Sequence, residues 1–200
     1  MEYSFMFKGF GAVLSGITKK ALNDKKVNSQ IKKSYKEIVL RAKDIGKSNN
    51  LLSSYALAAY FIAMNREDGL SAEENYKILD NGLRNSKLLK AFMGDSKGYF
   101  SEKHMEFRRK WSKLTNSEEN RKKYPNDWVV DVVEGNGDFV FGFDYRECGV
   151  CKLCRDENCF ELAKYLCKLD FMLVEIIGIK LKRTGTLADG CDKCDFRFYN

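Results

Sequence analysis

The sequence predicts an α+β protein in which N-terminal helices pack with a four-stranded antiparallel sheet. Three observations predict this class. Apolar residues recur at helical spacing through residues 1–124, two strand-like segments flank a glycine-rich turn just after Pro125, and a long helical pattern is then followed by two more strand-like segments. The order strand, strand, helix, strand, strand is typical of an antiparallel sheet covered by helices. We therefore expect a helical portion, 1–124, and a C-terminal unit, 125–200, within one integrated domain.

Helix-capping residues and glycines divide the helical portion into separate predicted helices. Residues 51–65 are apolar on most sides, which predicts a helix at the centre of the bundle. Ser71 and Glu74 form a capping-box pattern, in which each side chain satisfies a free backbone amide of the other, and this pattern opens the fourth helix. Gly46 and Gly94 are the expected helix stops. The expected helices are 5–17, 27–45, 51–65, 71–79, 86–93 and 101–114.

The C-terminal unit starts with a predicted β-hairpin. Segment 128–134 is rich in β-branched residues and follows the alternating pattern of a strand. Residues 135–137 (Gly-Asn-Gly) are typical of a turn, and 138–146 is again strand-like. A long helix is expected over 157–177. Two closing strands, 179–184 and 193–199, complete the four-stranded sheet.

Composition limits the classes of function. With 44% hydrophobic residues, 32% charged residues and one proline, the chain is typical of a globular protein rather than a disordered one. Its longest apolar run, 51–64, is shorter than the roughly 20 residues that a bilayer span needs. The N-terminus lacks the order of charged and apolar residues that marks a secretory signal. We expect a cytoplasmic protein without a membrane partner.

The charge is distributed unevenly along the chain. Residues 1–126 hold 25 Lys and Arg against 14 Asp and Glu, whereas residues 127–200 hold 10 against 14. A basic region can attract nucleic acid. However, these lysines are spread around amphipathic helices without a recognisable binding motif. Solvated helix faces explain them better, and nucleic acid is the least favoured partner.

All seven cysteines lie after residue 147. Their segregation indicates that the C-terminal quarter carries the chemistry. In a reducing cytoplasm, metal binding or thiolate chemistry is favoured over a disulfide framework. The cysteines are Cys148, Cys151, Cys154, Cys159, Cys167, Cys191 and Cys194.

Two metal sites and one plain alternative are consistent with this spacing. The run C-x2-C-x2-C-x4-C from Cys148 to Cys159 is similar to an iron–sulfur ligand run, although the usual closing Cys-Pro is missing. Alternatively, two C-x2-C knuckles can supply four sulfurs to zinc, namely Cys148 and Cys151 with Cys191 and Cys194. The candidate ligands for zinc or a cluster are therefore Cys148, Cys151, Cys154, Cys191 and Cys194. The plain alternative is that several of these thiols, Cys159 and Cys167 above all, are packing residues.

The same stretch resembles a known family. Cys167-x-x-Asp170 is followed by Arg183-Thr184-x-Thr186 and then by Gly190-x-x-x-Cys194-Asp195-Phe196-Arg197-Phe198. This order closely resembles the C-terminal signature of the L-2-amino-thiazoline-4-carboxylic acid hydrolase family, and Cys148 and Glu161-Leu162 also match it. The resemblance is strong over residues 145–198. Cys151, Cys154 and Cys191 are additions to the pattern, so the chain looks like a cysteine-rich member.

The resemblance implies a hydrolase that acts on the carbon–nitrogen bonds of a cyclic amidine and opens a thiazoline ring to a carbamoyl-cysteine type of product. Such a substrate needs a cation for its carboxylate, an acid for its amidine nitrogens, and a nucleophile or activated water. The resemblance makes Cys167, Cys194, Asp170 and Asp195 the catalytic candidates. Arg183 is the candidate for the carboxylate, and Thr184 and Thr186 are candidates for substrate binding or for shaping the loop.

Two other readings stay open. The only histidine, His104, lies in a polar helical stretch, and this scarcity argues against a Ser-His or Cys-His dyad. A weaker similarity to vinyl-reductase-type small-ligand-binding domains favours a sensor without enzymatic activity. A metal-binding module is the other alternative to the hydrolase.

Overall fold

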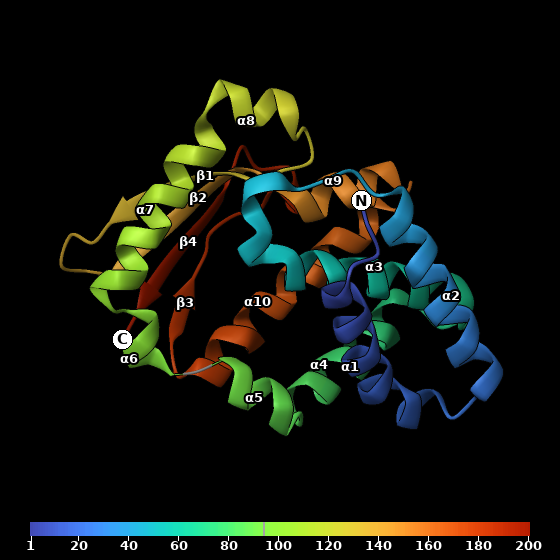
Figure 1. Cartoon of the computed structure of the whole chain (residues 1–200). Helices are drawn as coiled ribbons and strands as arrows, with labels where there is room; N and C mark the ends of the chain where they lie inside the picture. The colour runs from blue at the N-terminus through green and yellow to red at the C-terminus, as the bar shows by residue number, and fades with distance from the viewer. Residues whose placement is uncertain (94) are drawn as a thin grey trace.

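The α+β class is confirmed by the computed structural model, which describes residues 1–93 and 95–200 (Figure 1). The stop expected at Gly94 lies outside the described residues. The helices are α1 Phe5–Leu22, α2 Lys25–Arg41, α3 Leu52–Glu67, α4 Ala72–Arg84, α5 Lys87–Met93, α6 Ser96–Tyr99, α7 Glu102–Asn116, α8 Glu118–Lys123, α9 Gly149–Asp156 and α10 Ala163–Ile177. The strands are β1 Val129–Glu134, β2 Phe141–Glu147, β3 Lys180–Lys182 and β4 Cys194–Tyr199.

Helix α3 forms the centre of the helical layer, as its apolar sequence predicts. Nine of its residues are buried, among them four alanines that let neighbouring helices approach closely. Helices α1, α2 and α4 pack against it on one side of the molecule (Figure 1). Helix α4 begins with the predicted capping box, in which the Glu74 carboxylate accepts from the Ser71 backbone N–H at 2.8 Å.

The second helix is shorter than expected. It ends at Arg41 rather than at Gly46, because Ala42 adopts an extended conformation. Ala42 and Ile45 are nevertheless buried, so the apolar pattern continues where the helix does not. Gly46 instead starts a 3-10 helix, Gly46–Leu51, with a positive φ of 52°. A Cβ atom there would lie 2.3 Å from the ring of Tyr124, so only glycine fits.

The sheet is antiparallel throughout and has the order β1-β2-β4-β3. Because side chains alternate along a strand, one face carries aromatic rings from β2 and β4. Phe141 stacks on Phe198 at 4.8 Å, and Tyr145 meets Phe196 edge to face at 5.2 Å. This aromatic face belongs to the main hydrophobic core, which also contains the buried side chains of α3 and α10.

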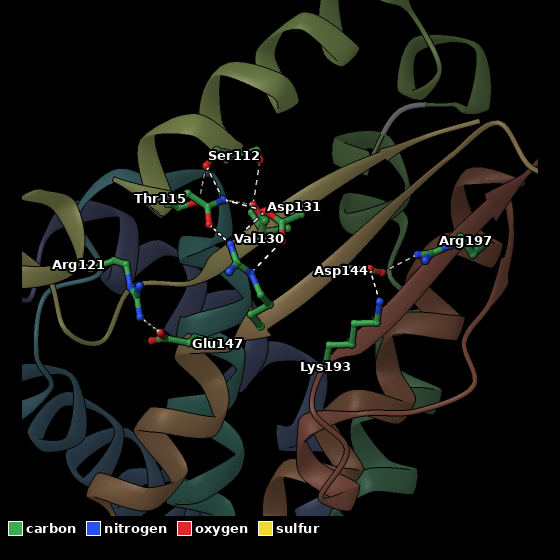
Figure 2. A network of polar contacts seen from close by, with 11 residues as sticks. Ser112, Thr115, Arg121, Val130, Asp131, Asp144, Glu147, Lys193 and Arg197 are labelled. Atoms are coloured by element: carbon green, nitrogen blue, oxygen red, sulfur yellow. Dashed lines mark hydrogen bonds and ion pairs between the residues drawn. The ribbon is translucent and has the colours of Figure 1, made fainter. Parts of the chain in front are cut away.

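The opposite face of the sheet is polar. Asp144 on β2 pairs with Arg197 on β4 at 2.9 Å and also with Lys193 (Figure 2). At the β1 edge, the Ser112 hydroxyl of α7 donates to the Val130 carbonyl at 2.9 Å, and Arg121 bonds Glu147 at 2.8 Å. These contacts hold α7 and α8 beside the sheet without adding to the core.

The hairpin has a longer connection than expected, because β2 begins at Phe141 rather than at residue 138. The Asn136 side chain accepts from the Asp138 backbone N–H at 3.0 Å, and Gly137 has a φ of 100°. At Gly135 a Cβ atom would lie 2.3 Å from the Val140 carbonyl oxygen. The turn therefore extends to Val140, whose N–H bonds Phe198 instead.

The predicted helix 157–177 is divided. Its first turn is a separate 3-10 helix, Phe160–Leu162, and α10 follows from Ala163. Before it, α9 occupies the cysteine run, where no helix was expected. Helix α10 runs between the sheet and the N-terminal helices (Figure 1) and contacts both β3 and α4.

Glu157 fastens the end of α9 to the helical layer. Its carboxylate accepts from Arg41 Nε at 2.7 Å and from Arg66 at 2.7 Å, and Arg66 also donates to the Glu157 carbonyl at 2.8 Å. Burial opposes the negative charge, but the bonds from Arg41 and Arg66 outweigh it and lower the pKa of Glu157. The pair of arginines on α2 and α3 thus fixes where α9 lies.

Within the described part of the chain, no helix combines the length and the apolar character needed to cross a membrane.

The Glu157 contact yields the first prediction. Glu157→Gln should lower the free energy of unfolding by about 2 kcal/mol at pH 7, because the charge-assisted hydrogen bonds from Arg41 and Arg66 are weakened at a buried site. The loss should be complete above the ordinary pKa of 4.5 and should shrink as the pH falls further, since the wild-type carboxyl then becomes neutral too. Urea denaturation measures it, with the exposed Glu119→Gln as control. Equal stability of Glu157→Gln and wild-type protein at pH 7 would contradict this assignment.

Candidate active site

A cavity of about 110 Å³ lies between α3, α9, α10 and the aromatic face of the sheet. We call it the thiol cavity, because Cys148, Cys167 and Cys194 all line it, together with Asp170 and Arg183. These three cysteines are the ones that match the family signature. The structure therefore brings together five residues that lie up to 46 positions apart in the sequence.

Each cysteine reaches the thiol cavity from a different element. Cys148 follows β2 and caps α9, and the tight packing of Gly149 on the Trp128 ring, where a Cβ atom would come within 2.7 Å, sets this change of direction. Cys194 is the first residue of β4 and pairs with Tyr145 of β2. Cys167 lies on α10, one helical turn before Asp170. The fold, rather than sequence proximity, makes the cluster.

The environment of Cys148 favours a thiolate. The Cys151 thiol, followed by the backbone N–H groups of Cys151 and Val150 at the start of α9, lowers the pKa of Cys148 despite burial. Positive partial charge at a helix N-terminus has this effect on thiols. Of the three thiols that line the cavity, Cys148 is the one whose pKa is lowered.

The other two thiols in the cavity are held neutral. Burial raises the pKa of Cys167, and the Asp170 charge adds to the effect. Burial raises the pKa of Cys194 to about 11, although its sulfur accepts from the Leu187 backbone N–H at 3.2 Å. The family resemblance makes Cys167 and Cys194 catalytic candidates, and burial favours the neutral thiol form of both.

Asp170 and Arg183 form an ion pair in the wall of the thiol cavity. An Arg183 nitrogen donates to Asp170 at 2.8 Å, another donates to the Cys167 carbonyl at 3.1 Å, and the guanidinium lies over the rings of Phe171 and Phe196. Burial raises the pKa of Asp170 to about 6, while Arg183 opposes that rise. Asp170 is therefore suited to acid–base work near neutral pH. Arg183 is already occupied, which disfavours the carboxylate-binding role expected for it.

Asp195, Thr184 and Thr186 do not line the thiol cavity. Asp195 accepts from the Thr184 backbone at 2.9 Å, from the Thr184 hydroxyl at 2.6 Å and from the Gly185 backbone at 2.9 Å. Thr186 caps the 3-10 helix Leu187–Asp189 by accepting from the Asp189 backbone. These contacts shape the loop that carries Leu187 to Cys194. They also explain why β3 ends at Lys182, two residues before the predicted end of that strand.

The candidate metal ligands are dispersed. Cys191 is exposed and packs against Gly185, where a Cβ atom would come within 2.7 Å of its sulfur, whereas Cys151 and Cys154 are buried in α9. Cys154 makes its thiol hydrogen bond with Cys159, and its electrostatic interactions with Cys148 and Cys167 are weaker. Over residues 1–93 and 95–200, no group of three or more His, Cys, Asp or Glu side chains is arranged to hold a metal ion. The zinc or iron–sulfur site stays a prediction.

A second and larger cavity, of about 730 Å³, adjoins the thiol cavity. Sequence reasoning missed its two central residues, Tyr99 and Arg108. The sequence signal was spacing: Arg108 lies three residues after Met105 and three before Trp111, which places it on the same apolar side of the helix. All three side chains are buried in the structure. His104 also lines this cavity, where its ring bonds the Ser101 hydroxyl and the Gly98 carbonyl. No described contact joins His104 to the thiol cavity.

Together, the fold and the site define an α+β protein with a cysteine-lined cavity between the long helix α10 and the sheet. The sequence profile of the L-2-amino-thiazoline-4-carboxylic acid hydrolase family matches residues 49–198. The chain belongs to this family, and the match reaches well beyond the C-terminal signature into α3. Comparisons with curated proteins and with solved structures gave no significant match.

Proposed function

We propose that the protein hydrolyses a small cyclic amidine acid of the L-2-amino-thiazoline-4-carboxylate type. The observation that carries this proposal is the convergence of Cys148, Cys167, Cys194 and Asp170 on one buried cavity in a member of this hydrolase family. The cavity is small, which suits a compact ring. A thiol nucleophile beside a titrating carboxyl is the equipment that addition to an amidine carbon needs.

Cys148 is the proposed nucleophile. Its thiolate adds to the carbon that bears the amino group. The ring carbon–sulfur bond then breaks, in place of the carbon–nitrogen bond expected from the class of hydrolase, because a carbamoyl-cysteine product keeps both nitrogens; the ring sulfur takes a proton. The covalent product is an isothiourea on Cys148. Water next adds to the same carbon, the Cys148 thiolate leaves, and a carbamoyl-cysteine product departs with a free thiol. The net reaction consumes one water and needs no oxidant or reductant.

Asp170 is the proposed acid–base group. Its carboxylate accepts a hydrogen bond from the protonated amidine, which places positive charge on the carbon under attack. In the second half-reaction the same carboxylate takes a proton from the attacking water. Arg183 is the positioning residue in this scheme, because its bond to Asp170 fixes the carboxyl group inside the cavity. A reducing compartment keeps the thiolate available, so we place the protein in the cytoplasm.

Loss of the nucleophile should abolish turnover. Cys148→Ser should lower kcat for L-2-amino-thiazoline-4-carboxylate by at least about 100-fold, because a serine hydroxyl is not ionised near neutral pH. The new thiol released by ring opening measures turnover. Cys191→Ser is the matched control, since Cys191 is exposed and outside the cavity, and it should keep full activity. Undiminished turnover by folded Cys148→Ser protein would refute the assignment.

The pH dependence tests Asp170. The pKa of its carboxyl is raised to about 6, and the ionised form is the active one in this scheme, so kcat/KM should rise as the pH increases through about 6. Asp170→Asn should be slow and should lack this acidic limb. Steady-state rates from about pH 5 to about pH 8 provide the measurement. An unchanged acidic limb in Asp170→Asn would assign the titration to another group.

A further inference from the structure

The two cavities adjoin along the sheet. The larger cavity lies between α7, the 3-10 helix Gly46–Leu51 and β2. Leu51 and Tyr145 line both this cavity and the thiol cavity. The Tyr145 side chain is half-buried. Desolvation raises the pKa of its hydroxyl, with further contributions from Tyr99 on one side and from Asp170, Cys148 and Cys194 on the other. Its neutral hydroxyl therefore stands at the junction of the two cavities.

Arg108 is the buried cation of the larger cavity, which the exposed side chains of Lys90 and Asp95 also line. It projects inward from α7 and is only 8% exposed. Its guanidinium lies 4.2 Å above the Tyr99 ring and 4.4 Å above the Phe141 ring. One of its nitrogens donates to the Tyr99 carbonyl at 2.8 Å and contacts the Met105 sulfur at 3.4 Å. In the described part of the chain, no carboxylate forms an ion pair with Arg108.

Two other arginines, Arg109 and Arg183, differ from Arg108 because each is paired with a carboxylate. Arg109, which faces outward from the same helix, bonds both Glu134 and Glu102 at 2.7 Å. Arg183, in the thiol cavity, forms an ion pair with Asp170. A buried guanidinium without a counter-ion is costly, and burial accordingly lowers the pKa of Arg108. An incoming carboxylate removes that cost and can bind the planar guanidinium through two parallel hydrogen bonds.

We propose that Arg108 is the carboxylate-binding residue, and that a substrate lies across the junction at Tyr145 with its carboxylate in the larger cavity and its ring at Cys148. This inference rests on the proposed function and adds the residue that binds the substrate carboxylate, since Arg183 holds Asp170 instead. It defines the substrate class as cyclic amidines that carry a free carboxylate. The volume of the larger cavity also admits a group attached near that carboxylate.

A binding experiment tests this separately from turnover. In the Cys148→Ser background, which holds the substrate without reaction, two probes are compared: L-2-amino-thiazoline-4-carboxylate and 2-amino-thiazoline, which lacks the carboxylate. Quenching of tryptophan fluorescence reports occupancy, because Trp111 lines the larger cavity and Trp128 lines the thiol cavity. The carboxylate probe should bind more tightly. Arg108→Met should weaken its binding on the order of 10- to 100-fold and leave the neutral probe unchanged.

The controls separate the possible outcomes. Arg109→Met is the matched variant, since it removes an adjacent arginine on the outer side of α7, and it should preserve the preference for the carboxylate probe. Arg108→Lys, which keeps the charge, should recover part of the affinity. The inference is overturned by equal affinity for both probes in the parent protein, by an intact preference in Arg108→Met, or by loss of the preference in Arg183→Met alone. If the preference follows Arg108 but no variant with an intact Cys148 turns over the acid, the hydrolase proposal fails and the carboxylate site stands.

Discussion

The ion pair between Asp170 and Arg183 is the interaction on which the arrangement of the site depends. It joins α10 to the loop after β3 across the wall of the thiol cavity. The surroundings of the pair have two chemical consequences. Desolvation raises the pKa of the Asp170 carboxyl to about 6 although Arg183 opposes the rise, and Arg183, the arginine expected to bind a substrate carboxylate, is held by Asp170. Among the described residues, Arg108 on α7 is a buried guanidinium without an acidic partner, and we propose it for the substrate carboxylate instead.

The fold was largely predictable because its elements have strong local signals. The capping box at Ser71, the apolar run of α3 and the alternating segments around the Gly135–Gly137 turn each depend on residues close in sequence. The errors occurred where tertiary contacts decide. Ala42 and Ile45 are buried although they lie after the end of α2. Helix α9 forms in a segment whose cysteines suggested a loop of metal ligands. Neither result follows from local propensity.

The site was predictable in part for the same reason. The family signature points to Cys148, Cys167, Asp170, Arg183 and Cys194, and all five line one cavity. Their roles depend on partners that a motif does not reveal. The bond between Asp170 and Arg183, the helix start at Cys148 and the inward direction of Arg108 are properties of the folded chain. The added thiols Cys151 and Cys154 lie on the buried side of α9, where they pack as part of the hydrophobic core.

The central claim is that Cys148 attacks the substrate, and covalent trapping tests it most directly. Wild-type protein quenched in acid during turnover of L-2-amino-thiazoline-4-carboxylate is digested, and the peptides are examined by mass spectrometry. The account predicts a mass increase equal to the complete substrate on Cys148, because thiolate addition with ring opening loses no atoms. A substrate-derived mass on Cys167 or Cys194, with Cys148 unmodified, would contradict it.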